Sequence, residues 1–319
     1  MRLLRSLRAA GPVLLAAAAP LAAAPGQSVT VSGRVLRGDQ TPLARQWAVL
    51  HRIGALDAGP VDSVRTDAAG RYVMTVAAVE PDADYFMSAE YHGIGYFSAR
   101  IPLDRGPRAD VPPLVVHDTS SSGPAIVLQR RLITMGRPGA DGSREVLELL
   151  ELLNPGTATR VSPDGLRPVW SGVLPREAVQ FQSGESDMSP GSITRLGERV
   201  GVFAPLPPAQ VHQVTFQYFL PADVRTLRLP IDQPVAELNV LLEDTAAVLS
   251  GLALEAVGVQ PIENRRFAGF RAGAVAGDTS VTIAFPAPPF RLDRLVPWIA
   301  GMTGLALALG LWRATRRET

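Results

Sequence analysis

Histidine is the only side chain in this sequence with an ordinary pKa near neutral pH, because the 319 residues include four histidines and no cysteine. All 31 basic residues are arginines. Without cysteine the chain has no thiolate nucleophile, disulfide, cysteine-ligated zinc, iron–sulfur cluster or covalently attached haem. Without lysine it forms no Schiff base and has no phosphate-loop lysine. Candidate chemistry therefore rests on histidine, carboxylate and aromatic side chains, and we expect no cofactor and no metal site.

His92 is the best candidate for a small polar site, since Glu90, Tyr91 and Tyr96 stand beside it in a predicted hairpin. Such a group could contact a ligand or a partner, although a hairpin tip without a binding role is the more common case. His212 falls on the apolar side of a predicted strand. A hydrogen-bonded structural histidine is more common there than a ligand or a base.

Two carboxylates and two tryptophans are the remaining candidates. Glu185 and Asp187 could act as acid and base or hold a cation, against the simpler interpretation of solvated loop charges. Trp47 and Trp170 could form exposed platforms for sugar or partner contact, against the simpler interpretation of core residues. The glycine-rich stretch 136–143 has neither the spacing nor the lysine of a phosphate loop, which predicts a plain turn.

Short alternating segments separated by turn residues predict that strands position these side chains. The segment 211–220 is the clearest, because apolar and polar residues alternate from 213 to 218. Further strands are expected at 29–35, 47–53, 61–66, 72–76, 85–91, 96–101, 238–242, 248–257, 267–272 and 281–285. Many short strands with regular turns predict an all-β chain made of tandem β-sandwich modules.

The segment 145–153 fits two interpretations. Its three glutamates recur at spacing three, which favours an amphipathic helix. The turn Asn154-Pro155-Gly156, followed by the segment 157–161, instead suggests a hairpin. We predict a strand, because the neighbouring segments are strands.

Three motifs in the first part of the chain carry a family resemblance. They are Val31-x-Gly33-x-Val35, Thr41-Pro42-Leu43 and, above all, Thr66-Asp67-Ala68-Ala69-Gly70-Arg71-Tyr72. In the last motif we expect Asp67 to cap the turn and Gly70 to supply a positive φ. Residues 27–118 resemble the carboxypeptidase regulatory-like domain, a transthyretin-like β-sandwich that serves as a non-catalytic accessory module. The resemblance implies a fold and a cell-envelope location, and no activity.

A zinc carboxypeptidase would need a separate catalytic domain with a His-x-x-Glu pair. None of the four histidines has a carboxylate at that spacing. The catalytic part of such an enzyme is therefore missing from the sequence, and we predict that the chain is not an enzyme.

Both ends of the chain carry membrane-directed segments. Residues 1–26 combine a basic start, an apolar run and small residues, which predicts a signal peptide cleaved before Gln27. Residues 295–312 carry no charge and reach about 27 Å as a helix, which predicts one transmembrane helix and a cytoplasmic tail at 313–319. A retained N-terminal anchor and a buried core helix are the alternatives. We therefore expect a single-pass membrane protein with most of the chain outside the cytoplasm, periplasmic or extracellular.

The region between these two ends is mildly acidic. Leaving out the three arginines of the signal segment and the two net positive charges of the tail lowers the formal charge from +1 to −4. Because no basic stripe is left to contact phosphates, we expect no nucleic-acid partner. After a polar linker at 119–124, residues 125–290 predict a second β-sandwich that is not assigned to a family.

Three functions remain open. The first is a non-enzymatic, membrane-anchored protein of the bacterial cell envelope, whose sandwich edges and loops bind an envelope protein partner or enter an assembly. The second is a carbohydrate or cell-wall binding module, which would need aromatic residues grouped on one exposed face. The third and most remote is a hydrolase that uses His92 or Glu185.

Overall fold

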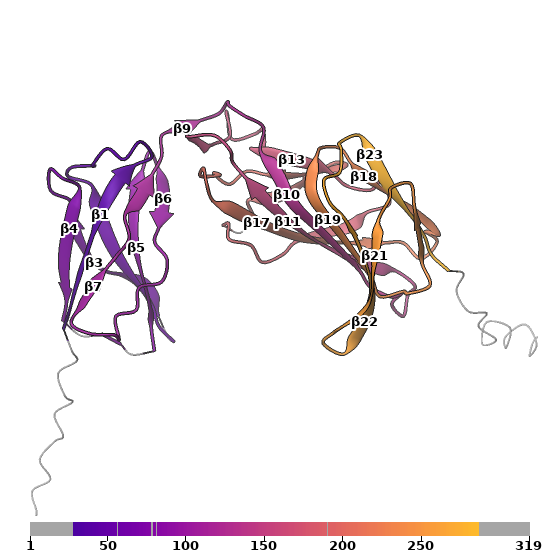
Figure 1. Ribbon diagram of the computed structural model, residues 1–319, viewed down its shortest axis with the longest axis horizontal. Helices are drawn as coiled ribbons and strands as arrows, with labels where there is room; N and C mark the ends of the chain where they lie inside the picture. Colours follow the sequence, from indigo (N-terminus) through magenta and orange to yellow (C-terminus); the bar gives the residue numbers. More distant parts are fainter. Residues whose placement is uncertain (1–27, 56, 78, 81, 190, 287–319) are drawn as a thin grey trace, which may run out of the picture. The chain divides into compact units, whose positions relative to one another are not determined.

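The structure is a computed structural model that describes residues 28–55, 57–77, 79–80, 82–189 and 191–286. The expected signal peptide at 1–26, transmembrane helix at 295–312 and tail at 313–319 lie outside the described residues. Within the described part every regular element is a strand, and no helix there is long and apolar enough to cross a membrane. The chain divides into two compact units, unit 1 up to Asp118 and unit 2 from Thr119 (Figure 1).

Unit 1 consists of two sheets that share one core. Its strands are β1 (Val29–Arg37), β2 (Trp47–Ile53), β3 (Ala58–Arg65), β4 (Arg71–Val76), β5 (Asp84–Tyr91), β6 (Ile94–Phe97), β7 (Arg108–Asp110) and β8 (Leu114–Val116). One sheet has the order β4-β1-β7, with β8 also paired to β1, and the other has the order β3-β2-β5-β6. Apolar residues of both sheets, such as Val31, Leu50 and Met87, form the core. The prediction of an all-β fold is confirmed for this unit.

The pairing of β1 with β4 explains two of the sequence motifs, because Gly33 lies opposite Tyr72. A Cβ atom at position 33 would stand 2.3 Å from Tyr72 Oη, so the tyrosine ring fills the space above the glycine. Tyr72 is 1% exposed, and its hydroxyl has no hydrogen-bond partner among the described residues. Burial raises the pKa of Tyr72 to about 12. Both motifs therefore serve the packing of the core.

The turn between β3 and β4 has the conformation expected from the sequence. Asp67 Oδ1 accepts hydrogen bonds from the backbone N–H groups of Ala69 and Arg71, both at 2.8 Å. The bond from Arg71 is the main cause of the lowered pKa of Asp67. Gly70 has a φ of +69°, and a Cβ atom there would lie 2.6 Å from the carbonyl oxygen of Val35. The predicted cap and the predicted glycine conformation are confirmed.

Unit 2 consists of a seven-stranded sheet, two three-stranded sheets and a short strand pair. Its strands are β9 (Thr119–Ser120), β10 (Val127–Met135), β11 (Arg144–Leu153), β12 (Thr159–Arg160), β13 (Trp170–Val173), β14 (Val179–Ser183), β15 (Ile193–Leu196), β16 (Arg199–Val202), β17 (Val211–Leu220), β18 (Thr226–Ile231), β19 (Val235–Leu242), β20 (Val248–Ser250), β21 (Glu255–Ile262), β22 (Arg265–Ala272) and β23 (Thr279–Ala284). The sheet orders are β14-β17-β11-β10-β19-β22-β21, β13-β16-β15, β18-β23-β20 and β12-β9. Residues of the seven-stranded and both three-stranded sheets form one apolar core, which makes this unit β-sandwich-like.

Strands β11 and β17 lie side by side along their whole lengths and show the alternation that the sequence indicated. The even-numbered residues of β17 face the core and are at most 6% exposed. The strand predicted at 145–153 is confirmed as β11. Its glutamate spacing resembled a helix because Glu148 is buried in the core while Glu145 and Glu151 lie on the opposite face.

Two local predictions are wrong. The hairpin expected after Asn154 does not form, because β12 pairs in parallel with β9 and not with β11. The Asn154 side chain is buried and takes over the role of a turn: its amide donates to the carbonyls of Ala158 and Leu206, and its oxygen accepts from the N–H of Gly156. The strand expected at 248–257 breaks at Gly251, which has a φ of +89°. Its two parts, β20 and β21, belong to different sheets.

Candidate functional site

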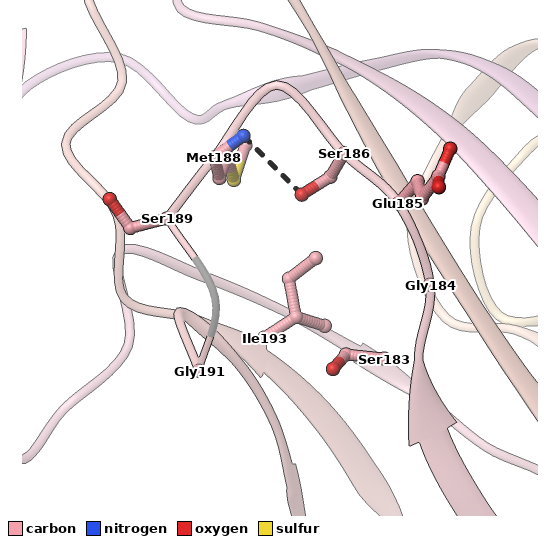
Figure 2. Close-up of a pocket in the computed structure, with 8 residues that line it drawn as sticks. All are labelled: Ser183, Gly184, Glu185, Ser186, Met188, Ser189, Gly191 and Ile193. Atoms are coloured by element: carbon pink, nitrogen blue, oxygen red, sulfur yellow. Dashed lines mark hydrogen bonds between the residues drawn. The ribbon is translucent and has the colours of Figure 1, made fainter. Parts of the chain in front are cut away.

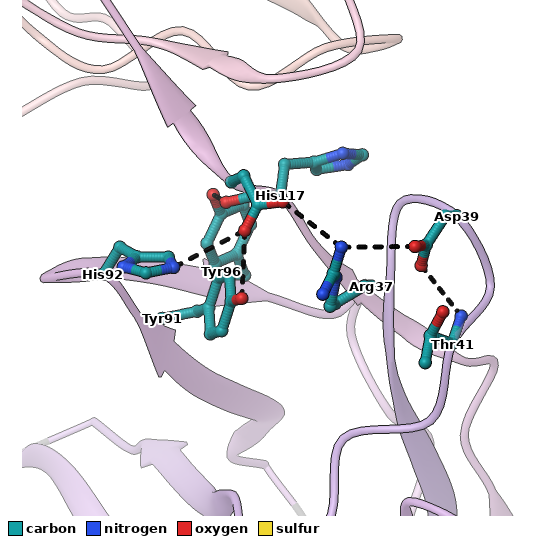
Figure 3. A network of polar contacts seen from close by, with 8 residues as sticks. Arg37, Asp39, Thr41, Tyr91, His92, Tyr96 and His117 are labelled. Carbon is teal, nitrogen blue, oxygen red and sulfur yellow. Dashed lines mark hydrogen bonds and ion pairs between the residues drawn. The ribbon is translucent and has the colours of Figure 1, made fainter.

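Asp118, the last residue of unit 1, is contacted by three polar side chains, those of Arg37, Tyr91 and His92, which are labelled in Figure 3. Tyr91 Oη donates to Asp118 Oδ1 at 3.0 Å, and His92 Nε2 lies 3.5 Å from the same oxygen. Arg37 Nη2 lies 3.4 Å from Asp118 Oδ2 and 3.2 Å from Asp39 Oδ2. We call these five residues the Asp118 cluster. They come from β1 and the loop after it, from the hairpin β5–β6 and from the segment after β8.

Of the four residues predicted in this hairpin, three contact the chain segment that ends unit 1, namely Tyr91, His92 and Tyr96. His92 and Gly93 form a two-residue turn with φ values of 51° and 75°. Tyr96, on β6, donates from its hydroxyl to the backbone carbonyl of His117 at 3.0 Å. Glu90 has an exposed side chain, and its backbone carbonyl accepts a hydrogen bond from Gln46.

The side chains of the Asp118 cluster are ionised or hydrogen-bonded but remain accessible to solvent. Desolvation and then the hydrogen bond and charge of Asp118 raise the pKa of Tyr91, so the phenol stays protonated and donates. Hydrogen bonds from Thr41 lower the pKa of Asp39. The side chains of Arg37, His92 and Asp118 are 37%, 53% and 55% exposed. Because water competes for every partner at such exposure, these contacts hold the end of unit 1 only weakly.

Unit 2 contains a pocket of about 650 Å³ beside the loop that joins β14 to β15 (Figure 2). Its lining residues are Ser183, Gly184, Glu185, Ser186, Met188, Ser189, Gly191 and Ile193. Figure 2 shows the side chains of Ser183, Ser186 and Ile193 turned toward the space that the loop encloses, and the Glu185 carboxylate directed away from it. Ser186 Oγ accepts a hydrogen bond from the N–H of Met188 at 3.3 Å. The pocket therefore offers hydroxyl groups to a small hydrogen-bonding ligand.

Asp187, in the same loop, contacts the buried residue His212 of β17. Its Oδ2 lies 3.3 Å from His212 Nδ1, and His212 is 6% exposed. The other ring nitrogen, Nε2, is buried and has no hydrogen-bond partner among the described residues. The apolar face of 211–220 correctly indicated a buried histidine. No sequence pattern indicated the pairing with Asp187, because this partner lies 25 residues away in an irregular loop.

The two tryptophans outside the terminal segments lie in different environments. Trp47 is 47% exposed, and the Arg65 guanidinium carbon stands 4.6 Å from its ring centroid. Trp170 is 7% exposed, and its Nε1 donates to Gln233 Oε1 at 2.8 Å. Only the Trp47 indole is therefore at the surface. Among the described residues, no group of three or more histidines and carboxylates could hold a metal ion.

A charged network that the sequence did not reveal lies inside unit 2. Glu148 accepts hydrogen bonds from Arg131 Nε at 2.8 Å, from Arg131 Nη2 at 3.2 Å and from Tyr218 Oη at 2.9 Å. Arg131 also donates to the carbonyl of Pro230 at 2.8 Å, which links the seven-stranded sheet to β18. Burial lowers the pKa of Arg131, but the attraction of Glu148 outweighs it and the net shift is upward. Burial and the Glu148 charge raise the pKa of Tyr218 well above its usual value. We call Arg131, Glu148 and Tyr218 the buried network.

No protein-family model and no curated protein matches the sequence. Among solved structures, the chain is similar to an M1 zinc metallopeptidase from Deinococcus radiodurans, with 12% identity and a TM-score of 0.32 over 54% of this chain and 46% of that one. It is similar to the major pilin SpaA of Corynebacterium diphtheriae, with 12% identity and a TM-score of 0.20 over 63% and 61% of the two chains. A third is the pilus protein RrgB of Streptococcus pneumoniae, with 9% identity and a TM-score of 0.21 over 83% and 63%. The chain spans less than half the length of the peptidase structures. At this level of likeness none of them assigns a function to it.

Proposed function

We propose that this chain is a non-enzymatic, membrane-anchored protein of the bacterial cell envelope, whose modules bind a protein partner or enter an assembly outside the cytoplasm. The uncharged segment 295–312 is its proposed anchor, and the residues after the signal segment are its proposed extracytoplasmic part. Unit 1 is proposed to be a carboxypeptidase regulatory-like module. Its motif residues Gly33, Asp67 and Tyr72 support that proposal by serving turn and core packing rather than chemistry.

The loop at 162–167 in unit 2 is the observation that carries the proposal. Leu166 at its tip is 82% exposed. Asp164 Oδ1 accepts hydrogen bonds from the N–H groups of Leu166 and Arg167 at 3.0 and 2.8 Å, and Arg167 Nε donates to Asp164 Oδ2 at 2.8 Å. Ser162 Oγ accepts from the N–H of Gly165 and donates to the carbonyl of Arg167. The loop therefore holds an apolar side chain in water on an ordered frame.

Such a frame favours binding because the entropy of ordering the loop is lost on folding and not on association. A single exposed leucine is ordinary in itself, so the argument depends on the hydrogen bonds that fix it. An apolar side chain held in this way fits a pocket on a protein partner, where its desolvation contributes to binding.

The interaction is tested by placing a photo-reactive amino acid at position 166 of the full chain in its native envelope. We expect one reproducible adduct mass from position 166 and none from position 248, because Val248 is also exposed, at 64%, but lies outside the loop. Asp164→Ala leaves Leu166 in place and loosens the loop, so it should reduce the adduct. Equal labelling from both positions, or none from either, would contradict the proposal.

The proposed location is tested by fractionation and protease treatment. We expect the chain to remain with the membrane after alkaline extraction, and its bulk to be cleaved by protease added outside the cytoplasmic membrane. Recovery of the whole polypeptide, start methionine included, from the soluble cytoplasm would contradict both the proposed anchor and the proposed export signal.

A second candidate is binding of carbohydrate or cell-wall material. The hydroxyl-lined pocket at 183–193 and the exposed indole of Trp47 favour it, although Arg65 already stacks on that ring. Retention of the protein on cell-wall polysaccharide, lost in Trp47→Ala or Ser186→Ala, would support this function over protein binding. Trp170→Ala is unsuitable for the test, because it removes a core side chain and would weaken the fold itself.

A further inference from the structure

Four of the five long sheet edges among the described strands carry a feature that blocks pairing with another chain. The long edges, with five or more residues, are β3, β4, β14, β18 and β21. Prolines interrupt three of them, namely Pro60, Pro230 and Pro261. A register shift and the positive φ of Gln180 distort β14. Proline and bulges on exposed strands are a known means of preventing edge-to-edge association.

Strand β4 is the exception. It pairs with β1 in unbroken register from Arg34↔Arg71 to Val29↔Val76 and contains no proline. Figure 1 shows β4 at the side of unit 1, with β1 as its neighbour in the sheet. Its outer edge is therefore a regular template for a further strand.

The hydrogen bonds of β1 determine which backbone groups of β4 point outward. Ser32 and Thr30 direct their bonds away from β4, since Val111 N donates to Ser32 O and Thr30 N donates to Pro107 O. Their partners across the ladder are Val73 and Thr75. In an antiparallel ladder, the backbone N–H and C=O groups of two opposite residues either both point toward the neighbouring strand or both point away from it. The N–H and C=O groups of Val73 and Thr75 therefore face outward, and no hydrogen bond to them is found among the described residues.

The outward groups of Arg71 are already used. Its N–H donates to Asp67 Oδ1 at 2.8 Å, and its carbonyl accepts from Asp67 N at 2.9 Å. A pairing strand thus has four free groups to bind, two on Val73 and two on Thr75. Val73 is 60% exposed, so an apolar β-branched side chain is also open to a neighbour on that strand.

We propose that the outer edge of β4 binds the same edge of a second copy of this chain, antiparallel and with Val73 opposite Thr75 of the other copy. This inference rests on the proposed function, because it names one contact through which the protein assembles. The two-fold arrangement uses all four free groups of each copy and forms four hydrogen bonds. It also places β-branched side chains opposite each other on the exposed face.

The Asp67 turn disfavours the adjacent register, in which Val73 lies opposite Val73 of the other copy. That register places Arg71 opposite Thr75 and forms only two hydrogen bonds, because the outward N–H and C=O groups of Arg71 are already bonded to Asp67. In the proposed register Arg71 lies opposite the uncharged Ala77. A second copy therefore pairs with the four free backbone groups of β4 and places no like charge opposite Arg71. An unrelated strand would meet both conditions only by chance.

The test is the association of the full chain in detergent, measured by sedimentation. Val73→Pro removes an outward N–H and, like the natural prolines of the other edges, should not disturb the pairing with β1. It removes two of the four hydrogen bonds, so we expect the association constant to fall about tenfold or more. Val248→Arg is the matched control, since Val248 is 64% exposed and lies in unit 2, and it should leave association unchanged.

Charge exchange tests the two-fold arrangement itself. Val73→Glu with Thr75→Glu, and Val73→Arg with Thr75→Arg, should each give a monomer, while an equal mixture of the two should associate again. An unaltered protein that stays monomeric at about 100 μM, or variants that associate like it, would overturn the inference. The adduct at position 166 should persist in Val73→Pro, so loss of self-association and loss of partner binding are separate results.

Discussion

An arginine, a carboxylate and a tyrosine hydroxyl meet in both units, but unit 1 keeps them at the surface and unit 2 keeps them in its core. The surface set is Arg37, Tyr91 and Asp118, and the buried set is Arg131, Glu148 and Tyr218. The Asp118 side chain is 55% exposed, whereas the Glu148 side chain is 1% exposed. Similar contacts thus lie at the solvent-exposed surface in unit 1 and in the core in unit 2.

Exposure to solvent determines how much stability is lost when one partner of such a contact is removed. At Asp118 water replaces any partner that is lost, so each ion pair contributes little. The Glu148 side chain is shielded from solvent, so removing one charge leaves the other buried and unpaired. The buried network therefore links β10, β11 and β17 through contacts that are costly to lose one at a time, whereas the contacts of the Asp118 cluster can be exchanged for water.

The largest expected effect is at Glu148. Glu148→Gln leaves the Arg131 guanidinium in the core without its counter-charge, and we expect unit 2 to lose about 3–5 kcal/mol of stability. Hydrogen exchange of the full chain, followed peptide by peptide, should show faster exchange across β10, β11 and β17 and unchanged exchange in unit 1.

A double variant provides the control for this prediction. Arg131→Met combined with Glu148→Leu removes both charges together and should restore most of the lost protection. A single variant within about 1 kcal/mol of the unaltered protein would mean that the buried network contributes no more than a surface pair.

Tyr72 gives the next largest effect, because it combines burial with an unsatisfied hydroxyl. Tyr72→Phe removes a group without a partner among the described residues, so we expect unit 1 to be as stable or up to about 2 kcal/mol more stable. Burial raises the pKa of Tyr72 to about 12. The unfolded chain, with an ordinary pKa of about 10, releases the proton first, so the native protein loses stability as the pH rises from about 10 to about 12.

The measurement compares denaturant unfolding of Tyr72→Phe and the unaltered chain by circular dichroism, at about pH 8 and about pH 11. At the higher pH the free energy of unfolding of the variant should increase relative to that of the unaltered chain. A loss of more than about 1 kcal/mol at the lower pH would show that the hydroxyl does have a stabilising contact.

A smaller effect is expected at the Asp118 cluster. Asp118→Asn removes the charge that Arg37 and His92 face but keeps an acceptor for Tyr91, so we expect less than about 1 kcal/mol of destabilisation. The difference should shrink further in about 1 M salt, because ions screen exposed pairs. Hydrogen exchange at the β5–β6 hairpin provides the readout. A loss as large as that at Glu148 would contradict the comparison.

The smallest effect is the acid sensitivity of the 162–167 loop. Backbone and side-chain hydrogen bonds from Arg167, with one from Leu166, lower the pKa of Asp164 to about 2. The unfolded chain has an ordinary aspartate pKa of about 3.9, so the stabilisation is complete above that pH and is lost as the pH falls toward about 2. Exchange of the Leu166 and Arg167 amides should increase in this window. Asp164→Asn should show no such dependence.

Much of the fold could be predicted because its signals are local. The alternation of 211–220 placed His212, Phe216 and Tyr218 on the buried face of β17. The Asp67 and Gly70 turn followed from side-chain and backbone chemistry within five residues. The hairpin after Asn154 failed for a physical reason: the buried side chain of Asn154 satisfies the loop, and β12 pairs with β9, about 40 residues earlier.

The candidate site residues were predictable only one at a time. His92 and Tyr96 were singled out, but not their partners, the Asp118 carboxylate for His92 and the His117 carbonyl for Tyr96. Glu185 and Asp187 were treated as a pair, whereas in the structure the Glu185 carboxylate is directed away from the pocket that the residue lines and Asp187 contacts His212. The contacts of His92, Tyr96 and Asp187 join segments that are distant in sequence, and no local pattern encodes their distance in space.

By itself the sequence determined that this chain forms strands, where most of them run, and which faces are apolar, because backbone periodicity and turn chemistry act over a few residues. Only the tertiary structure decided that Glu148 is buried with Arg131, that Asp187 meets His212, and that β4 is left as an open edge. Those outcomes depend on strand order and register, which are set by packing the whole core at once.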